Sequence, residues 1–452
     1  MKKLRICLPV MLMTALMLLG SCGERPKLAR VIREAGDNRY ELKNMLLFFQ
    51  IFDRNPEKLR AAEFLIENMS AHYSYEGTAI NDYYAYASEI LADATLTPEQ
   101  QRDSLLMITD SLYRDLPLHT VPDMKVVRGG ILIKTIRRSY DQWKNSPWAK
   151  HLTFDEYLEW LLPYKAAEYQ AMDYWRDTLL AYFGTGLQNA VKNDVEYGTT
   201  KGVADMIRNE AYNKLNRYGL YTRAGLPLLN AHLQVHQTFG NIPDYALTAV
   251  LAYRAAGIPA VLDETPVGSR YTAATKWYVI LDERGQELTS EWDLATFIGG
   301  AFFPNERGPK VYRNTYAIDK RREQYKRRSN YKYPFDLGKK DVTSKYFLTS
   351  DLELSIDRSK RRRLAEKYVY IASAVRDADN PWQIVDFGDL HKGKACFWNM
   401  GREVLYTVMG YDGDSLIEIT EPFILHKDGS METISSDTLN SKSLDKWKNN
   451  AL

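Results

Sequence analysis

The sequence predicts an α+β protein built in three successive parts. Apolar residues recur at helical spacing through the first third of the chain, and one helical pattern followed by short strand patterns occupies residues 226–293. Beyond residue 334 the pattern is all-β, with glycine-containing turns. We therefore expect a signal segment at 1–21, a helical region at 22–135, an α+β domain at 136–333 and a C-terminal β-sandwich at 334–452.

The first 21 residues are typical of a bacterial lipoprotein signal peptide. Lys2, Lys3 and Arg5 precede an apolar stretch over 6–19, and small residues lead to a cysteine in Leu19-Gly20-Ser21-Cys22. A transmembrane helix is the alternative, but it needs about 20 apolar residues. We expect lipid on Cys22 in the outer membrane and a soluble fold after it. Because no acidic cluster follows Cys22, the periplasmic face is favoured over the cell surface.

Cysteine usage and charge exclude several classes of function. The three cysteines are Cys7 in the signal segment, Cys22 and Cys396, so neither an intramolecular disulfide nor a paired-cysteine zinc site is expected. Without the three basic residues of the signal segment, the 60 basic residues become 57, against 58 acidic ones. This balance gives no drive toward nucleic acid. The basic runs at 320–332 and 358–367 are interpreted as solvated connectors.

Helices dominate up to residue 183. The pattern predicts helices at 40–52 and 98–113, and another that Asn55-Pro56 begins. In the block at 137–183, Thr153 to Glu156 is a capping box, and Pro163 should end or bend the helix that follows it. Aromatic residues in this block resemble a sugar platform, but their helical spacing favours a core role: Trp160, Tyr164, Tyr174 and Trp175.

The segment from 226 to 293 alternates one helix with short strands. A helix is expected at 244–256, stopped by Gly257, and strands at 258–262 and 276–281. A turn at 282–285 leads to a return strand at 287–289. The C-terminal part shows strand patterns at 351–357, 369–375, 404–408 and 416–419.

Two motifs in the middle segment carry a resemblance. They are Gly240-Asn241-Ile242-Pro243-Asp244-Tyr245-Ala246 and Tyr253-Arg254-Ala255-Ala256-Gly257-Ile258-Pro259-Ala260. They resemble the transglutaminase-like (papain-like) core, in which Gly-x-Cys-x-Asp-x-Ala opens a helix that ends at Arg-Ala-x-Gly-Ile-Pro-Ala. In that family His-x-Trp follows on a strand and an Asp on the next strand. Here Thr275-Lys276-Trp277 stands at the strand, and Asp293 is the candidate third position.

The resemblance implies that two of the three catalytic roles are vacant. The family's cysteine, activated at a helix N-terminus, corresponds to Ile242, and its histidine base corresponds to Thr275. Isoleucine is no nucleophile, and a threonine hydroxyl accepts no proton near neutral pH. Asp293 is the candidate for the third role. We therefore expect a pseudoenzyme.

Three groups of residues could substitute for the lost catalytic residues, and each is disfavoured. Cys396 lies in a strand pattern, where a buried structural thiol is the more common role. His232 and His236 stand four apart, but no acidic residue of the motif completes a metal site, so surface or packing roles are favoured. A glycosidase pair drawn from Asp244, Asp263 and Glu264 is disfavoured because acids are frequent in such segments.

The likeness extends along nearly the whole mature chain. Five further stretches, in the same order, resemble transglutaminase-core lipoproteins of glycan-degrading gut bacteria, which implies a glycan-utilisation context: 35–39, 58–69, 162–165, 310–313 and 341–343.

The expected function is binding without catalysis. A cleft over Ile242 is expected to be lined by Asp244, Tyr245, Tyr271, Trp277 and the retained Asp293. Its ligand would be a glycan, a peptidoglycan stem peptide or an envelope protein, with no cofactor, metal or nucleic acid, and with membrane contact only through the lipid. The alternatives are a scaffold for envelope assembly, with a groove filled by its own side chains, and a hydrolase with unrecognised residues.

Overall fold

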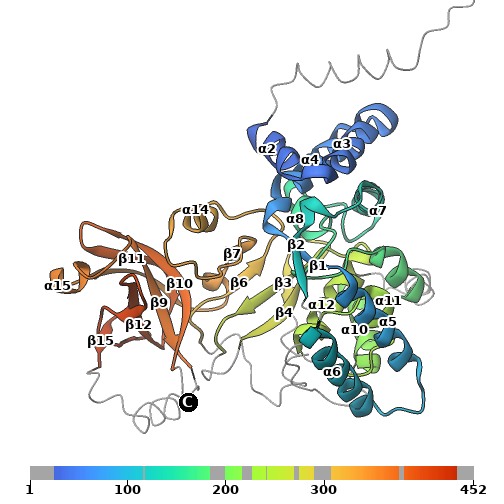
Figure 1. The fold of residues 1–452 in the computed structure, drawn as a ribbon. Coiled ribbons are helices and arrows are strands. Elements are labelled where there is room, and N and C mark those ends of the chain that lie inside the picture. Colours follow the sequence, from blue (N-terminus) through green and yellow to red (C-terminus); the bar gives the residue numbers. More distant parts are fainter. Residues whose placement is uncertain are drawn as a thin grey trace, which may run out of the picture.

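The computed structural model describes residues 25–115, 118–183, 199–215, 226–240, 242–268, 274–289, 307–375 and 381–434. Its fold is mixed α+β, with a helical N-terminal region and a C-terminal antiparallel sheet, as the sequence predicts. Figure 1 shows a small sheet between the helices on one side and the C-terminal sheet on the other. Among the described helices, none has the length and apolar character needed to cross a membrane.

Local signals fix the first helices. The side chain of Asn55 accepts hydrogen bonds from the backbone N–H groups of Glu57 and Lys58, so the predicted cap of α4 is confirmed. The predicted helix at 40–52 divides into α3 and a π-helical turn, η2. The elements of this region are α2 (Pro26–Glu34), η1 (Gly36–Asn38), α3 (Arg39–Leu47), η2 (Phe48–Asp53), α4 (Pro56–Asn68) and η3 (Met69–Ala71).

A two-stranded sheet and further helices follow. Thr153 and Glu156 form the predicted capping box of α8, which ends at Trp160, before Pro163. Residues 175–183 are helical as well. The elements are β1 (Tyr73–Glu76), α5 (Thr78–Ala92), α6 (Pro98–Asp115), β2 (His119–Pro122), η4 (Asp123–Lys125), α7 (Gly129–Asn145), α8 (Phe154–Trp160), α10 (Thr200–Leu215) and α11 (Ala231–Gln234).

The central sheet is antiparallel, in the order β5-β4-β3-β6-β7. Helix α12 (Ile242–Ala255) packs on it, and Gly257, with φ +83, ends the helix. The strands are β3 (Ala260–Thr265), β4 (Thr275–Leu281), β5 (Glu287–Thr289), β6 (Tyr312–Asn314) and β7 (Lys339–Asp341). Because β7 pairs with β6, this sheet extends past residue 334, where the sequence placed the start of the last domain.

The two faces of the central sheet belong to different cores. Val261, Trp277 and Val279 pack with the N-terminal helices. Leu262 and Tyr278, on the other face, pack with α12. Side chains alternate between faces along a strand, so β3 and β4 hold the helical region on one side and α12 on the other.

The C-terminal region forms one curled antiparallel sheet, which is consistent with the predicted sandwich-like packing. The long strand β10 pairs with β9 over Trp382–Asp389 and with β11 at its end, so both halves stay in one sheet. The strands are β8 (Thr349–Ser355), β9 (Tyr368–Ala374), β10 (Trp382–His391), β11 (Lys394–Gly401), β12 (Val404–Tyr411), β13 (Leu416–Glu418), β14 (Phe423–Leu425) and β15 (Met431–Thr433).

The two basic runs are not plain connectors. The first contains α14 (Lys320–Arg328), which buries Arg322 and Tyr325 while most of its basic side chains face solvent. The second contains the short helix α15 (Arg358–Arg361), with none of its residues buried. The 3-10 turn η5 (Thr343–Lys345) completes the described elements.

Candidate functional site

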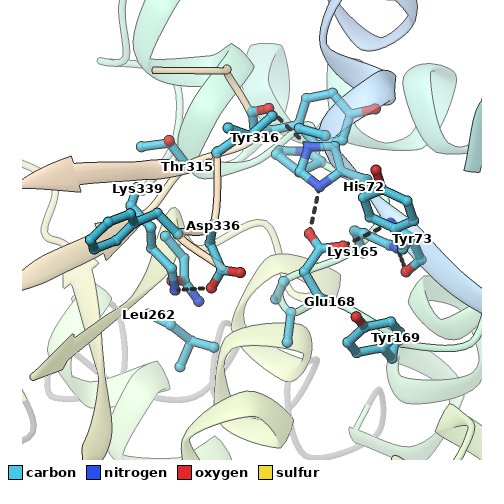
Figure 2. Close-up of a pocket in the computed structure, with 18 of the residues that line it drawn as sticks. His72, Tyr73, Lys165, Glu168, Tyr169, Leu262, Thr315, Tyr316, Asp336 and Lys339 are labelled. Atoms are coloured by element: carbon cyan, nitrogen blue, oxygen red, sulfur yellow. Dashed lines mark hydrogen bonds and ion pairs between the residues drawn. The ribbon is translucent and has the colours of Figure 1, made fainter. Parts of the chain in front are cut away.

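A cavity of about 720 Å³ lies between the helical region and the central sheet. One wall comes from residues 71–73 and 163–169, and the opposite wall from residues 314–316 and 325–339. Figure 2 shows His72, Glu168 and Tyr169 on the first wall, facing Asp336 and Lys339 on the second, with Leu262 of β3 below. Asp244 and Leu247 of α12 also line the cavity. It therefore reaches the first turn of the helix that the sequence singled out.

Strand alternation decides which predicted residues meet this cavity. Lys276 lies opposite Glu264 in the ladder, and Trp277 lies opposite Asp263. Lys276 and Leu262 line the cavity on the α12 side. Thr275 is two residues from Trp277 and shares the opposite face of the sheet. The structure thus brings together Asp244 and Lys276, and it places Thr275 on the face away from α12.

Two predicted binding aromatics lie in hydrophobic cores. Trp277 is 1% exposed, and its indole N–H donates to the hydroxyl of Tyr346 at 3.0 Å. Tyr245 is 5% exposed and packs near Tyr278. Neither is among the residues that line the cavity. Ile242 begins α12, but its side chain is outside the described residues. Cys22, Tyr271 and Asp293 are outside them altogether.

The aromatic surface of the cavity comes from other segments. Tyr73, Tyr169, Tyr333 and Phe335 line it. The ring of Tyr169 is stacked on Tyr75, with centroids 4.7 Å apart, and Tyr169 itself is 37% exposed. Its backbone has φ +61, a left-handed conformation that costs a non-glycine residue free energy and often marks a functional position. Tyr169 could not be identified from the sequence, because nothing in its local pattern distinguishes it from any other loop tyrosine.

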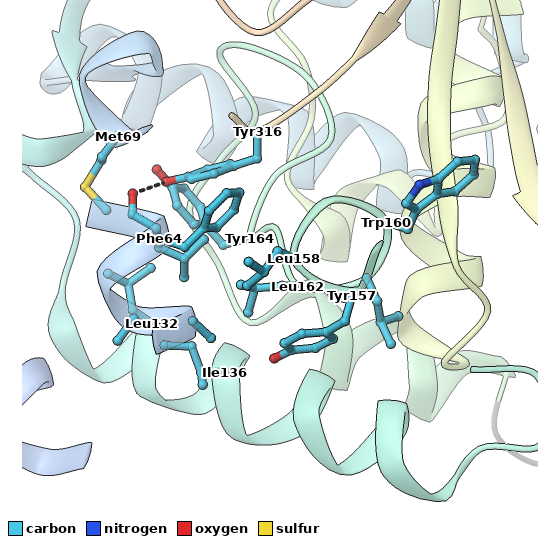
Figure 3. Close-up of a cluster of buried hydrophobic side chains, with 14 of the residues drawn as sticks. Phe64, Met69, Leu132, Ile136, Tyr157, Leu158, Trp160, Leu162, Tyr164 and Tyr316 are labelled. Carbon is cyan, nitrogen blue, oxygen red and sulfur yellow. Dashed lines mark hydrogen bonds between the residues drawn. The ribbon is translucent and has the colours of Figure 1, made fainter. Parts of the chain in front are cut away.

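The aromatic residues of the second helical block behave mostly as predicted. Trp160, Tyr164 and Trp175 are buried, and Figure 3 shows Trp160 and Tyr164 among the apolar side chains of the helical core. Tyr174 is half exposed and lies under the ammonium group of Lys134. A core role is therefore confirmed for three of the four.

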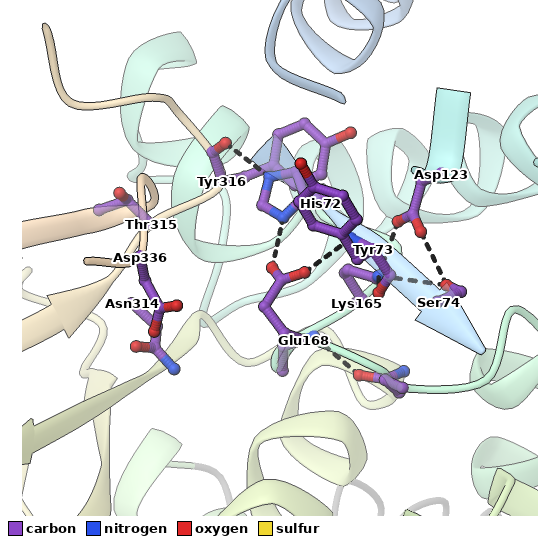
Figure 4. A network of polar contacts seen from close by, with 12 residues as sticks. His72, Tyr73, Ser74, Asp123, Lys165, Glu168, Asn314, Thr315, Tyr316 and Asp336 are labelled. Carbon is purple, nitrogen blue, oxygen red and sulfur yellow. Dashed lines mark hydrogen bonds and ion pairs between the residues drawn. The ribbon is translucent and has the colours of Figure 1, made fainter. Parts of the chain in front are cut away.

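A buried ion pair stands in the first wall. His72 Nδ1 lies 2.7 Å from Glu168 Oε1, and Nε2 lies 2.9 Å from the carbonyl oxygen of Tyr316 (Figure 4). Both acceptors lack a proton to donate, so both imidazole nitrogens act as donors and the ring carries a positive charge. The other carboxylate oxygen of Glu168 accepts from the backbone N–H of Tyr73. The pair joins β1, the 163–169 segment and the strand-to-helix segment after β6.

The charges of this pair shift both pKa values. Burial by itself would lower the pKa of His72, but the charge of Glu168 and its hydrogen bond outweigh burial, and the pKa is raised above 6.5. Burial would raise the pKa of Glu168, but His72 outweighs it and lowers the pKa to about 2. Both shifts favour the ionised pair. His72 is therefore not available as a general base in this arrangement.

A second buried ion pair, between Lys165 and Asp123, stabilises the same wall. Lys165 Nζ lies 2.6 Å from a carboxylate oxygen of Asp123 and donates to the carbonyl oxygen of Tyr73. Asp123 also accepts from the hydroxyls of Ser74 and Tyr164, both at 2.7 Å. The carboxylate is thus fully engaged, which makes a structural role the simplest account of this cluster.

A third charged group lies on the central sheet beside the cavity, where β3, β4 and β7 contribute one residue each. Glu264 contacts Lys339 at 2.7 Å and Lys276 at 3.0 Å, so two lysines share one carboxylate. Burial would raise the pKa of Glu264, but the two lysines, Lys339 first, lower it to about 2. Asp336 is 3.5 Å from Lys339 and its side chain is 57% exposed, so it compensates the second lysine only weakly.

Asp263, the two histidines and Cys396, which the sequence offered as alternative catalytic groups, lie in different parts of the molecule. Asp263 is completely buried and pairs with Arg313 through both carboxylate oxygens, on the face of β3 opposite Glu264. His232 and His236 are exposed, and within the described ranges no group of three His, Cys, Asp or Glu side chains could hold a metal ion. Cys396 is partly exposed, not buried as expected, and it lies on β11 in the C-terminal sheet.

The cavity combines aromatic surface, fixed charges and an opening to solvent, and its described lining contains no thiol and no serine hydroxyl. Such a lining is suited to binding a polar ligand with flat apolar faces. Comparison with protein-family models, curated proteins and solved structures finds no match to this chain.

Proposed function

We propose that this protein binds a ligand in the cavity beside α12 and does not cut it. The ligand is a glycan, a peptidoglycan stem peptide or an envelope protein. The chain is proposed to be a lipoprotein of the bacterial outer membrane, tethered through Cys22 and facing the periplasm. The domain around α12 is proposed to be a degenerate transglutaminase-like core. A helix that begins at the cavity and is followed by antiparallel strands supports this proposal.

One observation carries the proposal: an aromatic-lined cavity of about 720 Å³ reaches the first turn of α12. Pockets of this size hold small ligands in other proteins. A purely scaffolding protein would be expected to fill such a groove with its own side chains. A hydrolase would need free titratable groups, but His72 and Glu168 are engaged with each other and with backbone groups.

The test is binding of the mature chain, purified in detergent, to peptidoglycan and to a panel of glycans. Tyr169→Ala should weaken binding by about tenfold, because it removes an exposed ring from the cavity. Tyr174→Ala removes a ring that is half exposed elsewhere, and it should leave binding unchanged. Binding that neither variant alters would place the site outside this cavity. If nothing binds, the scaffold alternative gains support.

A further inference from the structure

The positive charges of the cavity exceed its negative charges. Three of its lining residues are acidic: Glu168, Asp244 and Asp336. Besides His72, whose charge is paired with Glu168, six are basic: Lys165, Arg254, Lys276, Lys326, Lys332 and Lys339. A cation that is already paired with a carboxylate of the protein offers little to an anionic ligand. The partners of each basic residue therefore decide whether it could bind one.

Two of the six cations are internally satisfied. Lys165 is paired with Asp123. Arg254 is 3% exposed, and its guanidinium donates to the backbone carbonyls of Trp160, Ala260, Lys165 and Glu159. These two groups hold the wall and the end of α12 in place, and a ligand would gain little from them.

The other four cations face the cavity with less compensation. Lys276 and Lys339 share Glu264, which leaves one positive charge that the exposed Asp336 only partly balances. Lys326 lies over the ring of Tyr73 and donates to its hydroxyl, while Lys332 donates to the backbone carbonyls of Lys326 and Ser329. Among the described contacts, neither Lys326 nor Lys332 meets a carboxylate.

The tyrosine rings that line the cavity favour one class of anionic ligand over another. Figure 2 shows Tyr73 and Tyr169 on the wall that faces Asp336 and Lys339. The negative face of a tyrosine ring attracts the C–H groups on the flat side of a sugar ring. A peptide would instead pair with a free strand edge. At Tyr73 that edge is already used, because its N–H donates to Glu168 and its carbonyl accepts from the N–H of Tyr169.

From these contacts we propose that the cavity binds an acidic oligosaccharide, with a carboxylate between Lys276 and Lys339 and a sugar ring against Tyr169. This inference rests on the proposed binding function and narrows its ligand class. Asp336, at 3.5 Å from Lys339, stands where the ligand carboxylate would bind and is displaced by it. Lys326 and Lys332 would meet further acidic units at the mouth.

The experiment compares oligogalacturonate with the same oligomer in its fully methyl-esterified form, using calorimetry on the full mature chain in detergent. The two probes share the pyranose ring and differ in charge. We expect the acid to bind about tenfold more tightly than the ester at low salt, and the difference to shrink as salt is added. A muropeptide stem peptide serves as the third probe.

Two variants locate the charge. Lys276→Gln should weaken binding of the acid about tenfold and leave binding of the ester unchanged. Lys345→Gln is the matched control: Lys345 is also partly exposed and paired with a glutamate, Glu287, but it is not among the cavity residues. It should change neither. Circular dichroism of both variants verifies that they fold.

The outcomes distinguish failure of the acidic-ligand proposal from failure of the proposed binding function. Equal binding of acid and ester, or a Lys276→Gln variant that binds the acid normally, would overturn the acidic ligand and leave the binding function standing. Binding of the stem peptide alone would also overturn it, in favour of a peptide ligand. If none of the probes binds, and the glycan and peptidoglycan panel is negative too, the binding function itself fails.

Discussion

His72 connects segments of the chain that are far apart in sequence. Its ring is stacked on Tyr316, 4.3 Å between centroids, and its two nitrogens meet Glu168 and the Tyr316 carbonyl oxygen. Because His72 is 4% exposed, the positive charge of its ring depends on Glu168 for compensation. The first wall of the cavity is therefore held by an ion pair whose strength depends on pH.

The pKa shifts of His72 and Glu168 determine how the stability of the protein changes with pH. The raised pKa of His72 adds stability below its ordinary 6.5, and this is lost as pH rises through the raised value. The lowered pKa of Glu168 adds stability above 4.5, and this is lost as pH falls through about 2. The pair therefore stabilises most between about 4.5 and 6.5.

We predict that Glu168→Gln lowers the free energy of unfolding by about 2 kcal/mol at pH 5.5, at the low end for a buried pair because Glu168 is partly exposed. At pH 9.5 the difference from wild type should be smaller, since His72 loses its proton. Denaturant unfolding at both pH values measures this. Glu89→Gln, at an exposed position of α5, is the control. A difference that is the same at both pH values would contradict the ion pair.

Trp277 shows how a motif residue can belong to the core. Trp277→Ala should lower the free energy of unfolding by about 3–5 kcal/mol, because it empties a fully buried site between the sheet and the helical region. Trp398→Ala, at a 52% exposed tryptophan, should cost less than about 1 kcal/mol. Thermal unfolding of the two variants gives the comparison. Similar losses for both would mean that Trp277 is not packed as described.

At the scale of elements, helix α8 is a short helix whose start depends on its cap. Glu156 Oε2 accepts from the backbone N–H and the hydroxyl of Thr153, and Thr153 Oγ1 accepts from the N–H of Glu156. Thr153→Ala should cost about 1 kcal/mol, whereas Thr153→Ser keeps the acceptor and should cost a few tenths. Denaturant midpoints test the order of the two variants. Equal losses would show that the hydroxyl contributes nothing to the cap.

Elements were predictable where their signals are local. Helix ends are set by residues close to them in the sequence: Asn55 caps α4, Thr153 begins the capping box of α8, and Gly257 ends α12. The positions of these helices could therefore be predicted from the sequence. The cavity could not be predicted in this way, because its walls come from residues 71–73, 163–169, 314–316 and 325–339. Only long-range packing brings these segments together. Likewise, a motif indicates a strand but not which face of the sheet meets α12.

At the scale of the whole molecule, the central and C-terminal sheets are joined through buried charges. Lys310 is completely buried; its ammonium group contacts Asp341, the last residue of β7, and the backbone carbonyl of Trp398 on β11. Asp386 of β10 lies 3.4 Å away and also pairs with Arg321 of α14. Burial would raise the pKa of Asp386, but the charges of Lys310, Arg321 and Arg322 together outweigh burial and lower the pKa. The ionised network therefore spans both sheets.

We predict that Lys310→Met uncouples the two sheets. It leaves Asp341 and Asp386 with less compensation at the junction and should lower the free energy of unfolding by about 3 kcal/mol. Hydrogen exchange at increasing denaturant should then show β9 opening before β3, whereas in the wild type both strands should open together. Lys394→Met, which breaks an exposed pair with Glu353 inside the C-terminal sheet, should change neither. Joint opening of β9 and β3 in the Lys310 variant would mean that apolar contacts alone couple the sheets.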